Sequence, residues 1–159
     1  TELIIYQNNT SHIQSFPFGI VTLSQSTDQK KDLQLFQSEV EKFLASCSLD
    51  IQNSIFISTA GTPTIIAALK HGLDNSQYDK HIINGTTLTL EEVEAIQAKL
   101  QSISKEELIV KVGTGREDFI NTGMLIYALF FRTLQKEISV VFDDGLREGV
   151  ALNACALKY

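Results

Sequence analysis

The alternation of apolar runs and polar turns at the start of the chain predicts three short strands. Apolar and β-branched residues fill Leu3–Tyr6, Ile13–Phe16 and Ile20–Leu23, and polar residues with Pro17 and Gly19 separate these runs. Apolar and β-branched residues favour strands, whereas Asn, Ser, Gly and Pro favour turns. We therefore expect the chain to open with a three-strand β-meander.

Helical periodicity dominates the next part of the chain. After Thr27–Asp28, which can cap a helix, apolar residues recur at the spacing of one helix face; they are Leu33, Phe36, Val40, Phe43 and Leu44. Thr89–Glu92 and Ser104–Glu107 have the pattern of capping boxes, so each should begin a helix. Gly115–Thr133 contains a long apolar stretch and predicts the central helix.

Two short apolar runs, Ile55–Ile57 and Ile138–Phe142, predict strands that are buried inside a sheet. Each is followed by a glycine-containing turn and then by a helix, over Ile65–His71 and Leu146–Leu157. Strands that alternate with helices after an opening meander indicate an α/β domain with a mixed sheet and helices on both faces. This order is similar to that of a ribonuclease-H-like domain, the building block of the actin-like ATPases and the sugar kinases.

Composition narrows the classes of function. The chain has 159 residues, 43% hydrophobic and 20% charged, so we expect residues 1–159 to form a single domain. Its net charge of -6 argues against binding to nucleic acid or to an anionic membrane. The most apolar stretch, Met124–Phe131, is too short to cross a bilayer. Two cysteines cannot build a disulfide framework, so we expect reduced, buried thiols and a cytoplasmic protein.

A run of small and hydroxyl-bearing residues after the first buried strand is the first candidate site. It consists of Ser58, Thr59, Ala60, Gly61, Thr62, Pro63 and Thr64. Ligands of open α/β sheets bind at the carboxyl ends of strands, and a helix N-terminus favours an anion. These residues therefore predict a phosphate-binding loop. The alternative is a plain strand-to-helix turn, with Thr62 as the cap and Pro63 at the first helical position.

Two further candidates lie at similar places. Asp143–Gly145 follows the last strand, and its two carboxylates can either hold a divalent cation or form an ordinary Asp-Gly turn. Arg116 stands in the first turn of the central helix, where a positive charge opposes the helix dipole. Its guanidinium suits a phosphate group, and the alternatives are an ion pair with Glu117 or Asp118, or a side chain that is simply solvated.

The sequence contains no pattern typical of a zinc site, a catalytic serine or a common nucleotide-binding loop. The three histidines lack the spacing of zinc ligands, and no nucleophile elbow, P-loop or dinucleotide fingerprint is present. A carboxylate at Glu2, on the first strand, gains significance only if other polypeptide precedes it.

Five segments, in order along nearly the whole chain, resemble the exopolyphosphatase/guanosine pentaphosphatase (Ppx/GppA) family. They are Phe16–Gly19 with Val21 and Leu23; Ser58–Thr64 with Ala67 and Ala68; Asn84–Gly85 followed by Leu88–Val93; Gly115–Arg116 through Ile120 and Gly123; and Asp143 with Gly145–Gly149. The family's second phosphate motif, Asp-x-Gly-Gly-Gly-Ser-Thr-Glu, ends in the Thr1–Glu2 pair with which this chain opens. The resemblance therefore implies the C-terminal lobe of a two-lobe module, cut inside that motif.

The resemblance also implies an activity. Such enzymes use a cleft between two ribonuclease-H-like lobes to remove the terminal phosphate of inorganic polyphosphate or guanosine pentaphosphate. They need a divalent cation, usually Mg²⁺, and their catalytic base glutamate lies in the other lobe. By resemblance, Glu2 positions the metal or the attacking water, and Arg116 contacts substrate phosphates. The remaining phosphate contacts implied are Thr1, Ser58, Thr59, Ala60, Gly61, Thr62, Asp143 and Gly145.

Asp144 and Thr22 depart from the family pattern, because basic residues are common at both positions. We expect the parent protein to be a phosphoanhydride hydrolase whose own N-terminal lobe is a partner of this chain, and the isolated chain to be inactive. One alternative is a non-catalytic regulatory module that binds polyphosphate or guanosine tetra- or pentaphosphate. Another is half of an actin-like or sugar-kinase ATPase. The resemblance also allows a homodimer.

Overall fold

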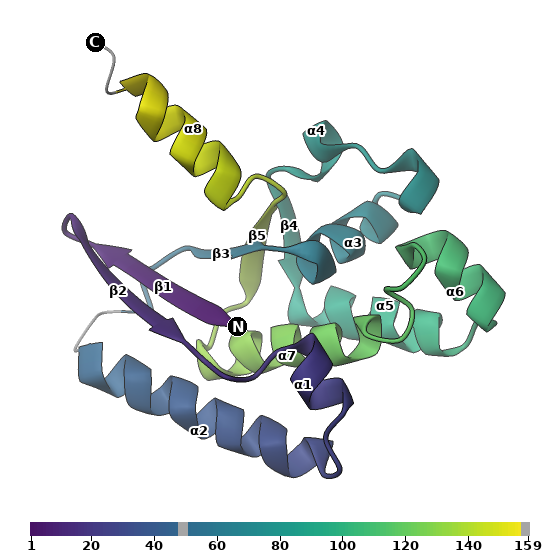
Figure 1. The fold of residues 1–159 in the computed structure, drawn as a ribbon, viewed down its shortest axis with the longest axis horizontal. Coiled ribbons are helices and arrows are strands. Elements are labelled where there is room, and N and C mark those ends of the chain that lie inside the picture. The colour runs from purple at the N-terminus through teal and green to yellow at the C-terminus, as the bar shows by residue number, and fades with distance from the viewer. Residues whose placement is uncertain (48–50, 157–159) are drawn as a thin grey trace.

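The computed structural model describes residues 1–47 and 51–156 of the chain. Within these residues Figure 1 shows strands and helices alternating along the chain. The strands are β1 (Glu2–Gln7), β2 (Thr10–Ser15), β3 (Phe56–Thr59), β4 (Thr86–Thr89) and β5 (Ile138–Phe142). The helices are α1 (Ile20–Ser24), α2 (Gln29–Cys47), α3 (Gly61–Lys70), the 3-10 helix η1 (Asn75–Gln77), α4 (Lys80–Ile83), α5 (Leu90–Gln101), α6 (Lys105–Val112), α7 (Ile120–Thr133) and α8 (Leu146–Ala156).

The strands of the described residues form two separate sheets. β1 and β2 are an antiparallel hairpin whose turn residues Asn8 and Asn9 have positive φ angles of 51° and 60°. Positive φ at both positions is what a two-residue type I′ turn requires, and Asn tolerates it. The second sheet has the order β3–β5–β4, with β5 parallel to β3 and antiparallel to β4. The predicted mixed sheet is therefore confirmed.

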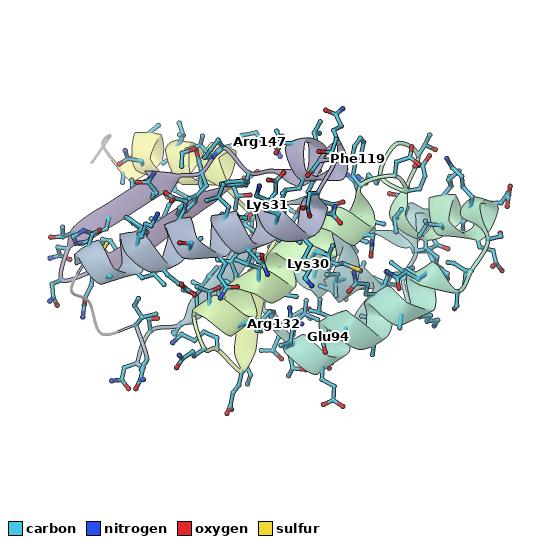
Figure 2. All side chains as sticks on the ribbon, turned by 90° about the horizontal axis from the view of Figure 1, so that it is seen from below. Lys30, Lys31, Glu94, Phe119, Arg132 and Arg147 are labelled. Atoms are coloured by element: carbon cyan, nitrogen blue, oxygen red, sulfur yellow. The ribbon has the colours of Figure 1, made fainter. Side chains whose placement is uncertain are left out.

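Helix α7 lies at the centre of the core (Figure 1). With α3, α5 and the mixed sheet it forms one buried cluster, which includes Ile66, Leu88, Val112, Met124 and Val141. With α2 and the segment after β2 it forms a second, aromatic cluster, which includes Phe16, Phe36, Val40 and Phe130. At its carboxyl-terminal end, Arg132 pairs with Glu94 of α5 (Figure 2). Because both clusters need α7, its prediction as the central helix is confirmed.

The third predicted strand is wrong, because Ile20–Leu23 belongs to helix α1. Gly19 is the N-cap residue of this helix, and the Thr22 hydroxyl both accepts the Gly19 N–H (2.8 Å) and donates to the Gly19 carbonyl (3.1 Å). These local bonds, together with the burial of Leu23, outweigh the preference of Ile and Val for strands. The opening meander is therefore a two-strand hairpin followed by a helical turn.

Two helix boundaries also differ from the prediction. α7 begins at Ile120 rather than Gly115, because residues 113–119 form turns in which Gly113 and Gly115 have φ angles of 92° and 80°. α3 begins at Gly61, so the predicted turn after β3 is shorter than expected. The last residue of the predicted final helix, Leu157, lies outside the described residues.

The expected burial of β3 holds for only one of its faces. Phe56 and Ser58 point toward the helices, whereas Ile57 on the opposite face is 58% exposed. Ile138 of β5 is likewise 50% exposed. Helix α8 buries none of its residues, although Leu146, Val150 and Leu152 are apolar. An apolar surface therefore remains open on this side of the mixed sheet.

Both cysteines are free, as expected, but Cys155 is exposed and Cys47 only half-buried, so the expectation of buried thiols is wrong. Among the described helices, none has the length and apolar character needed to cross a bilayer.

Both predicted capping boxes are confirmed. At α5 the Thr89 hydroxyl accepts the Glu92 N–H (3.2 Å) and the Glu92 carboxylate accepts the Thr89 N–H (3.0 Å). At α6 the Ser104 hydroxyl and the Glu107 carboxylate do the same for each other's backbone N–H. Glu92 also pairs with Lys70 at 2.6 Å, which joins α5 to α3.

Replacing Glu92 by glutamine is expected to reduce the loss of stability in acid. The hydrogen bond from Lys70, followed by that from the Thr89 N–H, holds the pKa of Glu92 below its ordinary value. A carboxylate whose folded pKa is depressed stabilises the protein above its unfolded pKa of about 4.5, and this contribution disappears as the pH falls through the folded pKa. Glutamine keeps the capping bond but has no charge to lose.

Urea unfolding from about pH 5 to pH 3 measures this effect as a shallower pH dependence in Glu92→Gln than in the native protein. Glu107→Gln is the matched control, because Glu107 holds the same capping position and forms no ion pair with another described residue. Equal acid sensitivity of Glu92→Gln and the native protein would contradict the prediction.

Candidate functional site

The loop between β3 and α3 exposes an uncapped helix N-terminus. Its N-cap residue, Ala60, has a φ of 115°, which non-glycine residues rarely adopt, and no side chain caps the helix. Among the described residues, none accepts a hydrogen bond from the backbone N–H of Gly61 or Thr62. Two N–H groups at the positive end of a ten-residue helix are suited to an anion.

The Ser58 side chain points into the core, away from the exposed N-terminus of α3. Its side chain is buried and its hydroxyl lies 2.9 Å from both the Tyr127 hydroxyl and the Ser139 hydroxyl. These three groups satisfy one another in the core, and burial raises the pKa of Tyr127. Thr59, the next residue, is exposed at the end of β3. The Ser58 side chain therefore links β3, β5 and α7 and faces away from the open edge.

The other threonines of the loop are also engaged internally. The Thr64 hydroxyl lies 3.1 Å from the carbonyls of Ala60 and of Gly61. Thr62 packs against α7, because a Cβ built on Gly123 would overlap its Oγ1. The loop therefore offers mainly backbone N–H groups to a ligand, and the packing of Thr62 on Gly123 fixes where those groups lie.

Gly123→Ala is expected to destabilise the protein by about 1–3 kcal/mol. The added Cβ would overlap Thr62 Oγ1 and lie 3.1 Å from Thr62 Cβ and Cγ2, so α7 or the start of α3 must move. Gly149→Ala is the matched control, since this helical glycine has nothing within 4 Å of an added Cβ. That variant should gain up to about 1 kcal/mol from helix propensity.

Urea unfolding of both variants measures the two changes in the free energy of unfolding, which should have opposite signs. Adding Thr62→Ala to Gly123→Ala removes Oγ1 and Cγ2 and should restore part of the lost stability. Equal effects of alanine at positions 123 and 149 would contradict this packing.

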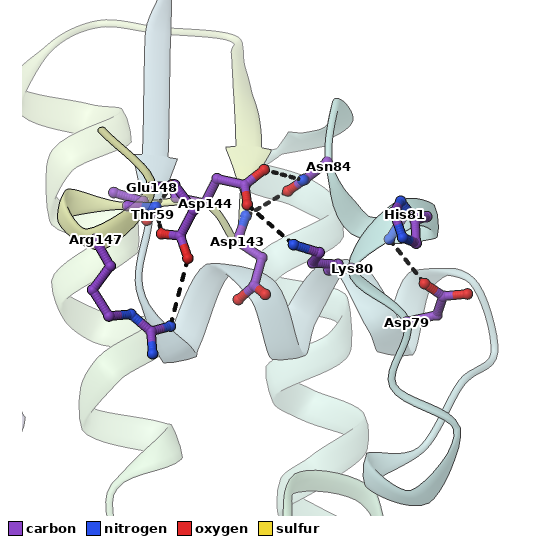
Figure 3. A network of polar contacts seen from close by, with 10 residues as sticks. Thr59, Asp79, Lys80, His81, Asn84, Asp143, Asp144, Arg147 and Glu148 are labelled. Atoms are coloured by element: carbon purple, nitrogen blue, oxygen red, sulfur yellow. Dashed lines mark hydrogen bonds and ion pairs between the residues drawn. The ribbon is translucent and has the colours of Figure 1, made fainter. Parts of the chain in front are cut away.

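The two carboxylates of the turn after β5 differ in their contacts, because only that of Asp144 forms an ion pair (Figure 3). The Asn84 Oδ1 accepts the Asp143 N–H, and the Asn84 Nδ2 donates to Asp144 Oδ2, both at 2.6 Å. Lys80 also pairs with Asp144 at 3.6 Å. In Figure 3 the Asp143 carboxylate points away from Asn84 and Lys80. The charge of Asp144 is therefore balanced by Lys80, whereas Asp143 forms no ion pair with another described residue.

One bond holds this turn against β3, and a second joins it to the first turn of α8. The Thr59 hydroxyl donates to the Asp144 carbonyl at 3.4 Å, and the Gly145 N–H donates to Glu148 Oε2 at 2.8 Å. The Gly145 N–H also holds the pKa of Glu148 below its ordinary value. The carboxyl ends of β3 and β5 are thus joined into one edge, as their parallel pairing predicts.

Tyr78, just before α4, links this turn with the start of α3. Its hydroxyl interacts with Thr64 and with Asp143, and it lies in the field of Arg116. Burial raises the pKa of Tyr78; Asp143 acts in the same direction, whereas Thr64 and Arg116 act in the opposite one. Tyr78 therefore lies close enough to Thr64, Asp143 and Arg116 for each of them to influence its pKa. A single tyrosine forms no sequence pattern, so sequence reasoning missed it.

Arg116 is exposed, and its guanidinium forms no ion pair or hydrogen bond with another described residue. The alternative pairing with Asp118 or Glu117 is wrong, because Asp118 pairs with Lys105 at 3.1 Å and the buried Glu117 Oε2 has no hydrogen-bond partner among the described residues. The other alternative, a solvated Arg116, agrees with its exposure. The Arg116 carbonyl accepts the N–H groups of Phe119 and Ile120, so Arg116 lies in the turn before α7. Its positive charge is free for a ligand.

Thr1 and Glu2 stand at the start of β1. The Thr1 amino group donates to the carbonyls of Phe16 (3.2 Å) and Phe18 (2.8 Å). Glu2 is exposed, and no interaction among the described residues links it to Arg116 or Asp143. The described residues also contain no group of three or more side chains that could together hold a metal ion. The predicted metal ligand therefore stands alone in this chain.

The chain is similar to known proteins over almost its whole length. A family model, described as the Ppx/GppA phosphatase family, matches residues 1–157. No curated protein sequence matches the chain. The chain is similar in fold to a Ppx/GppA family member from Aquifex aeolicus, with a TM-score of 0.77, 23% identity, and coverage of 99% of this chain and 53% of that chain.

Two further solved structures are similar in fold to this chain. One is of the Aquifex aeolicus PPX-GPPA enzyme (TM-score 0.75, 24% identity, 96% of this chain and 52% of that chain). The other is an exopolyphosphatase from Cytophaga hutchinsonii (TM-score 0.71, 18% identity, 96% and 53%). The chain therefore spans about half the length of these structures.

These similarities confirm the predicted fold class, because the similar structures have the ribonuclease-H-like fold of the actin-like proteins. The five segments that carry the resemblance are spread along the same range that the family model matches. Since that range is almost the whole chain, the protein belongs to the Ppx/GppA phosphatase family.

Proposed function

We propose that this chain is one lobe of a two-lobe, Mg²⁺-dependent hydrolase that releases the terminal phosphate of inorganic polyphosphate or guanosine pentaphosphate. The observation that supports it best is the shared edge at the carboxyl ends of β3 and β5, where the uncapped start of α3 and the turn that holds Asp143 are joined by the bond from Thr59 to Asp144. Arg116, which has no ion pair among the described residues, is near enough to this edge to influence the pKa of Tyr78. The similar structures, which are about twice as long and include an exopolyphosphatase, support the two-lobe arrangement.

The terminal phosphates of either substrate are dense anions. The N–H groups of Gly61 and Thr62 can each donate to a phosphate oxygen, and the helix dipole of α3 adds to their attraction. The planar guanidinium of Arg116 can donate two parallel hydrogen bonds to a second phosphate oxygen pair. These donors stabilise the charge that spreads over the transferred phosphoryl group, provided that the second lobe closes the site to water.

Two carboxylates of the proposed site, Glu2 and Asp143, are of the kind that Mg²⁺ binds. Mg²⁺ commonly binds one or two carboxylates together with substrate phosphates. The ion would supply positive charge that neutralises the phosphate oxygens. In this proposal Glu2 orients the attacking water, and a glutamate of the second lobe takes its proton.

Phosphate release by the two-lobe protein, with polyphosphate, guanosine pentaphosphate and ATP as separate substrates, tests the proposal. We expect release from one or both of the first two substrates, its loss with a chelator, and none above background by the 159-residue chain alone. Equal rates for the isolated chain and the two-lobe protein would contradict the lobe assignment.

The same assay addresses the alternatives. Tight binding of guanosine pentaphosphate or polyphosphate without turnover would indicate a regulatory module. Preferential hydrolysis of ATP would indicate an actin-like or sugar-kinase ATPase. Either result would overturn the proposed activity.

A further inference from the structure

A pocket of about 340 Å³ lies between α5, α6 and the start of α7. Its floor is apolar: Leu100 and Met124 belong to the buried cluster around the mixed sheet, and Ile103 and Leu108 pack against that cluster. The residues proposed above to contact phosphate are not among the described residues that line it. The pocket is therefore a second cavity, and its volume is that of a site for a small molecule.

Three carboxamides form a fixed network in the wall of this pocket. Gln97 Nε2 and Gln101 Nε2 both donate to Asn121 Oδ1, at 2.6 and 2.8 Å, and these bonds join α5 to α7. Among the described residues, none donates a hydrogen bond to the Oε1 atom of Gln97 or Gln101. The two glutamines are thus held in place, and their oxygens can still accept hydrogen bonds.

The carboxylate of Glu117 also lines the pocket and has no partner. Its Oε2 is buried, and no described residue forms a hydrogen bond or an ion pair with this group. Buried polar atoms normally have a partner, because leaving one unpaired is unfavourable. The two oxygens share one charge, so a cation in the pocket is attracted to the whole group. Burial strengthens this attraction, since water screens it less than at an exposed carboxylate.

The charged lining of the pocket is negative. It consists of Lys105, Glu117 and Asp118, so one positive and two negative charges leave a net charge of one negative. Lys105 interacts electrostatically with Glu117, but its ammonium group forms its hydrogen bond with Asp118, at 3.1 Å. Asp118 and Lys105 therefore balance each other, and the charge of Glu117 is left for a ligand.

We propose that this pocket binds a small organic cation in which a planar amidinium or guanidinium group is joined to an apolar body. The N–H groups of such a cation diverge from one plane, so they can donate to the Glu117 carboxylate and to a glutamine oxygen together. The apolar body covers the floor at Leu100 and Leu108. Binding at this pocket is independent of the proposed hydrolase activity.

Other ligand classes fit the lining less well. An anion would meet the net negative charge, and a neutral apolar molecule would leave the Glu117 carboxylate without a partner. A bare metal ion is also a poorer ligand, because the described residues contain no group of three or more side chains that could together hold one.

Titration of the two-lobe protein with benzamidine tests the proposal, followed by nuclear magnetic resonance of the backbone amides. Benzamide is the matched control ligand, since it has nearly the same shape and no charge. We expect benzamidine to shift the amides of Gln101, Glu117 and Asn121 with a Kd of about 1 mM or below. Benzamide should bind at least about 10-fold more weakly, because it makes no charge-assisted bond. Equal binding of the two, or no shifts at these three residues, would overturn the proposal.

A pair of variants separates the pocket from general charge. Glu117→Gln removes the proposed partner of the cation and should weaken benzamidine binding at least about 10-fold. Glu91→Gln is the matched control, because Glu91 is exposed on α5, does not line the pocket and forms no ion pair with another described residue. It removes the same charge and should change the affinity by less than about twofold. Equal weakening by both variants would show that net charge alone attracts the ligand.

The same titration of the 159-residue chain identifies a different occupant. If the isolated chain bound benzamidine and the two-lobe protein did not, the rest of the polypeptide would fill the pocket, and the small-molecule site would be refuted. Binding needs no turnover, so an inactive two-lobe protein that still binds benzamidine at Glu117 would refute the proposed activity and leave this site standing.

Discussion

Phe36→Ala is expected to lower the free energy of unfolding by about 3–5 kcal/mol. Phe36 is fully buried, and its ring centre lies 5.4 Å from that of Phe16, 5.0 Å from that of Phe18 and 5.7 Å from that of Phe130. These partners come from the segment after β2 and from α7, so the cavity left by alanine cannot close by the shift of one element. Domains are stable by only about 5–15 kcal/mol, so this single change removes a large fraction of the total.

Urea unfolding of the isolated chain measures the effect as a lower midpoint with an unchanged slope. Leu35→Ala is the matched control, because Leu35 is the preceding residue of α2, is 51% exposed, and should cost no more than about 0.5 kcal/mol. Phe36→Leu should fall between the two. A loss at Phe36 no larger than at Leu35 would show that the aromatic cluster does not join the hairpin to α7.

The parts of the fold that the sequence predicted well are those fixed by neighbours along the chain. The capping boxes at Thr89 and Ser104 depend on residues three apart, and both begin helices as predicted. The wrong strand at Ile20–Leu23 has a cause of the same local kind. The Thr22 hydroxyl accepts the Gly19 N–H at the start of α1. The β-branched residues of the run favour a strand, so the composition alone did not indicate this cap.

The local sequence pattern does not predict which face of β3 is buried. An apolar run predicts burial on both faces, but which residue faces the core depends on how the strand pairs and on what covers it. Ser58 faces inward because Tyr127 and Ser139 satisfy its hydroxyl, and the more apolar Ile57 faces outward. The apolar run therefore predicts the strand itself but not which of its two faces is buried.

The sequence predicts those site residues that lie in a turn between a strand and a helix, such as Gly61 and Asp143. It does not predict contacts between residues that are far apart in the sequence. The contact of Asn84 with Asp144 joins residues 60 positions apart, and with Lys80 it accommodates the charge of Asp144. The relation of Tyr78 to Asp143 and Thr64 likewise depends on the fold and has no counterpart in the local sequence.

Arg116→Ala is expected to slow phosphate release by the two-lobe protein by about 100- to 1,000-fold, the usual cost of removing one donor to the transition-state charge. This expectation depends on the proposed function. Arg116 is exposed and has no partner among the described residues, so the free energy of unfolding should change by less than about 0.5 kcal/mol. Arg116→Lys keeps the charge but loses the planar fork, so its rate should lie between those of the native protein and the alanine variant.

Arg132→Ala separates a local role of Arg116 from a general effect of charge. Both variants remove one positive charge from an acidic chain, but Arg132 lies at the other end of α7, paired with Glu94. Fourteen helical residues at about 1.5 Å each separate that end from the turn that holds Arg116. If attraction of the polyanion by net charge were what matters, both variants would slow release equally, and salt would abolish the difference from the native protein. If Arg116 contacts the phosphate, only its loss lowers kcat, and the deficit persists at high ionic strength, since a contact inside a closed site is screened little.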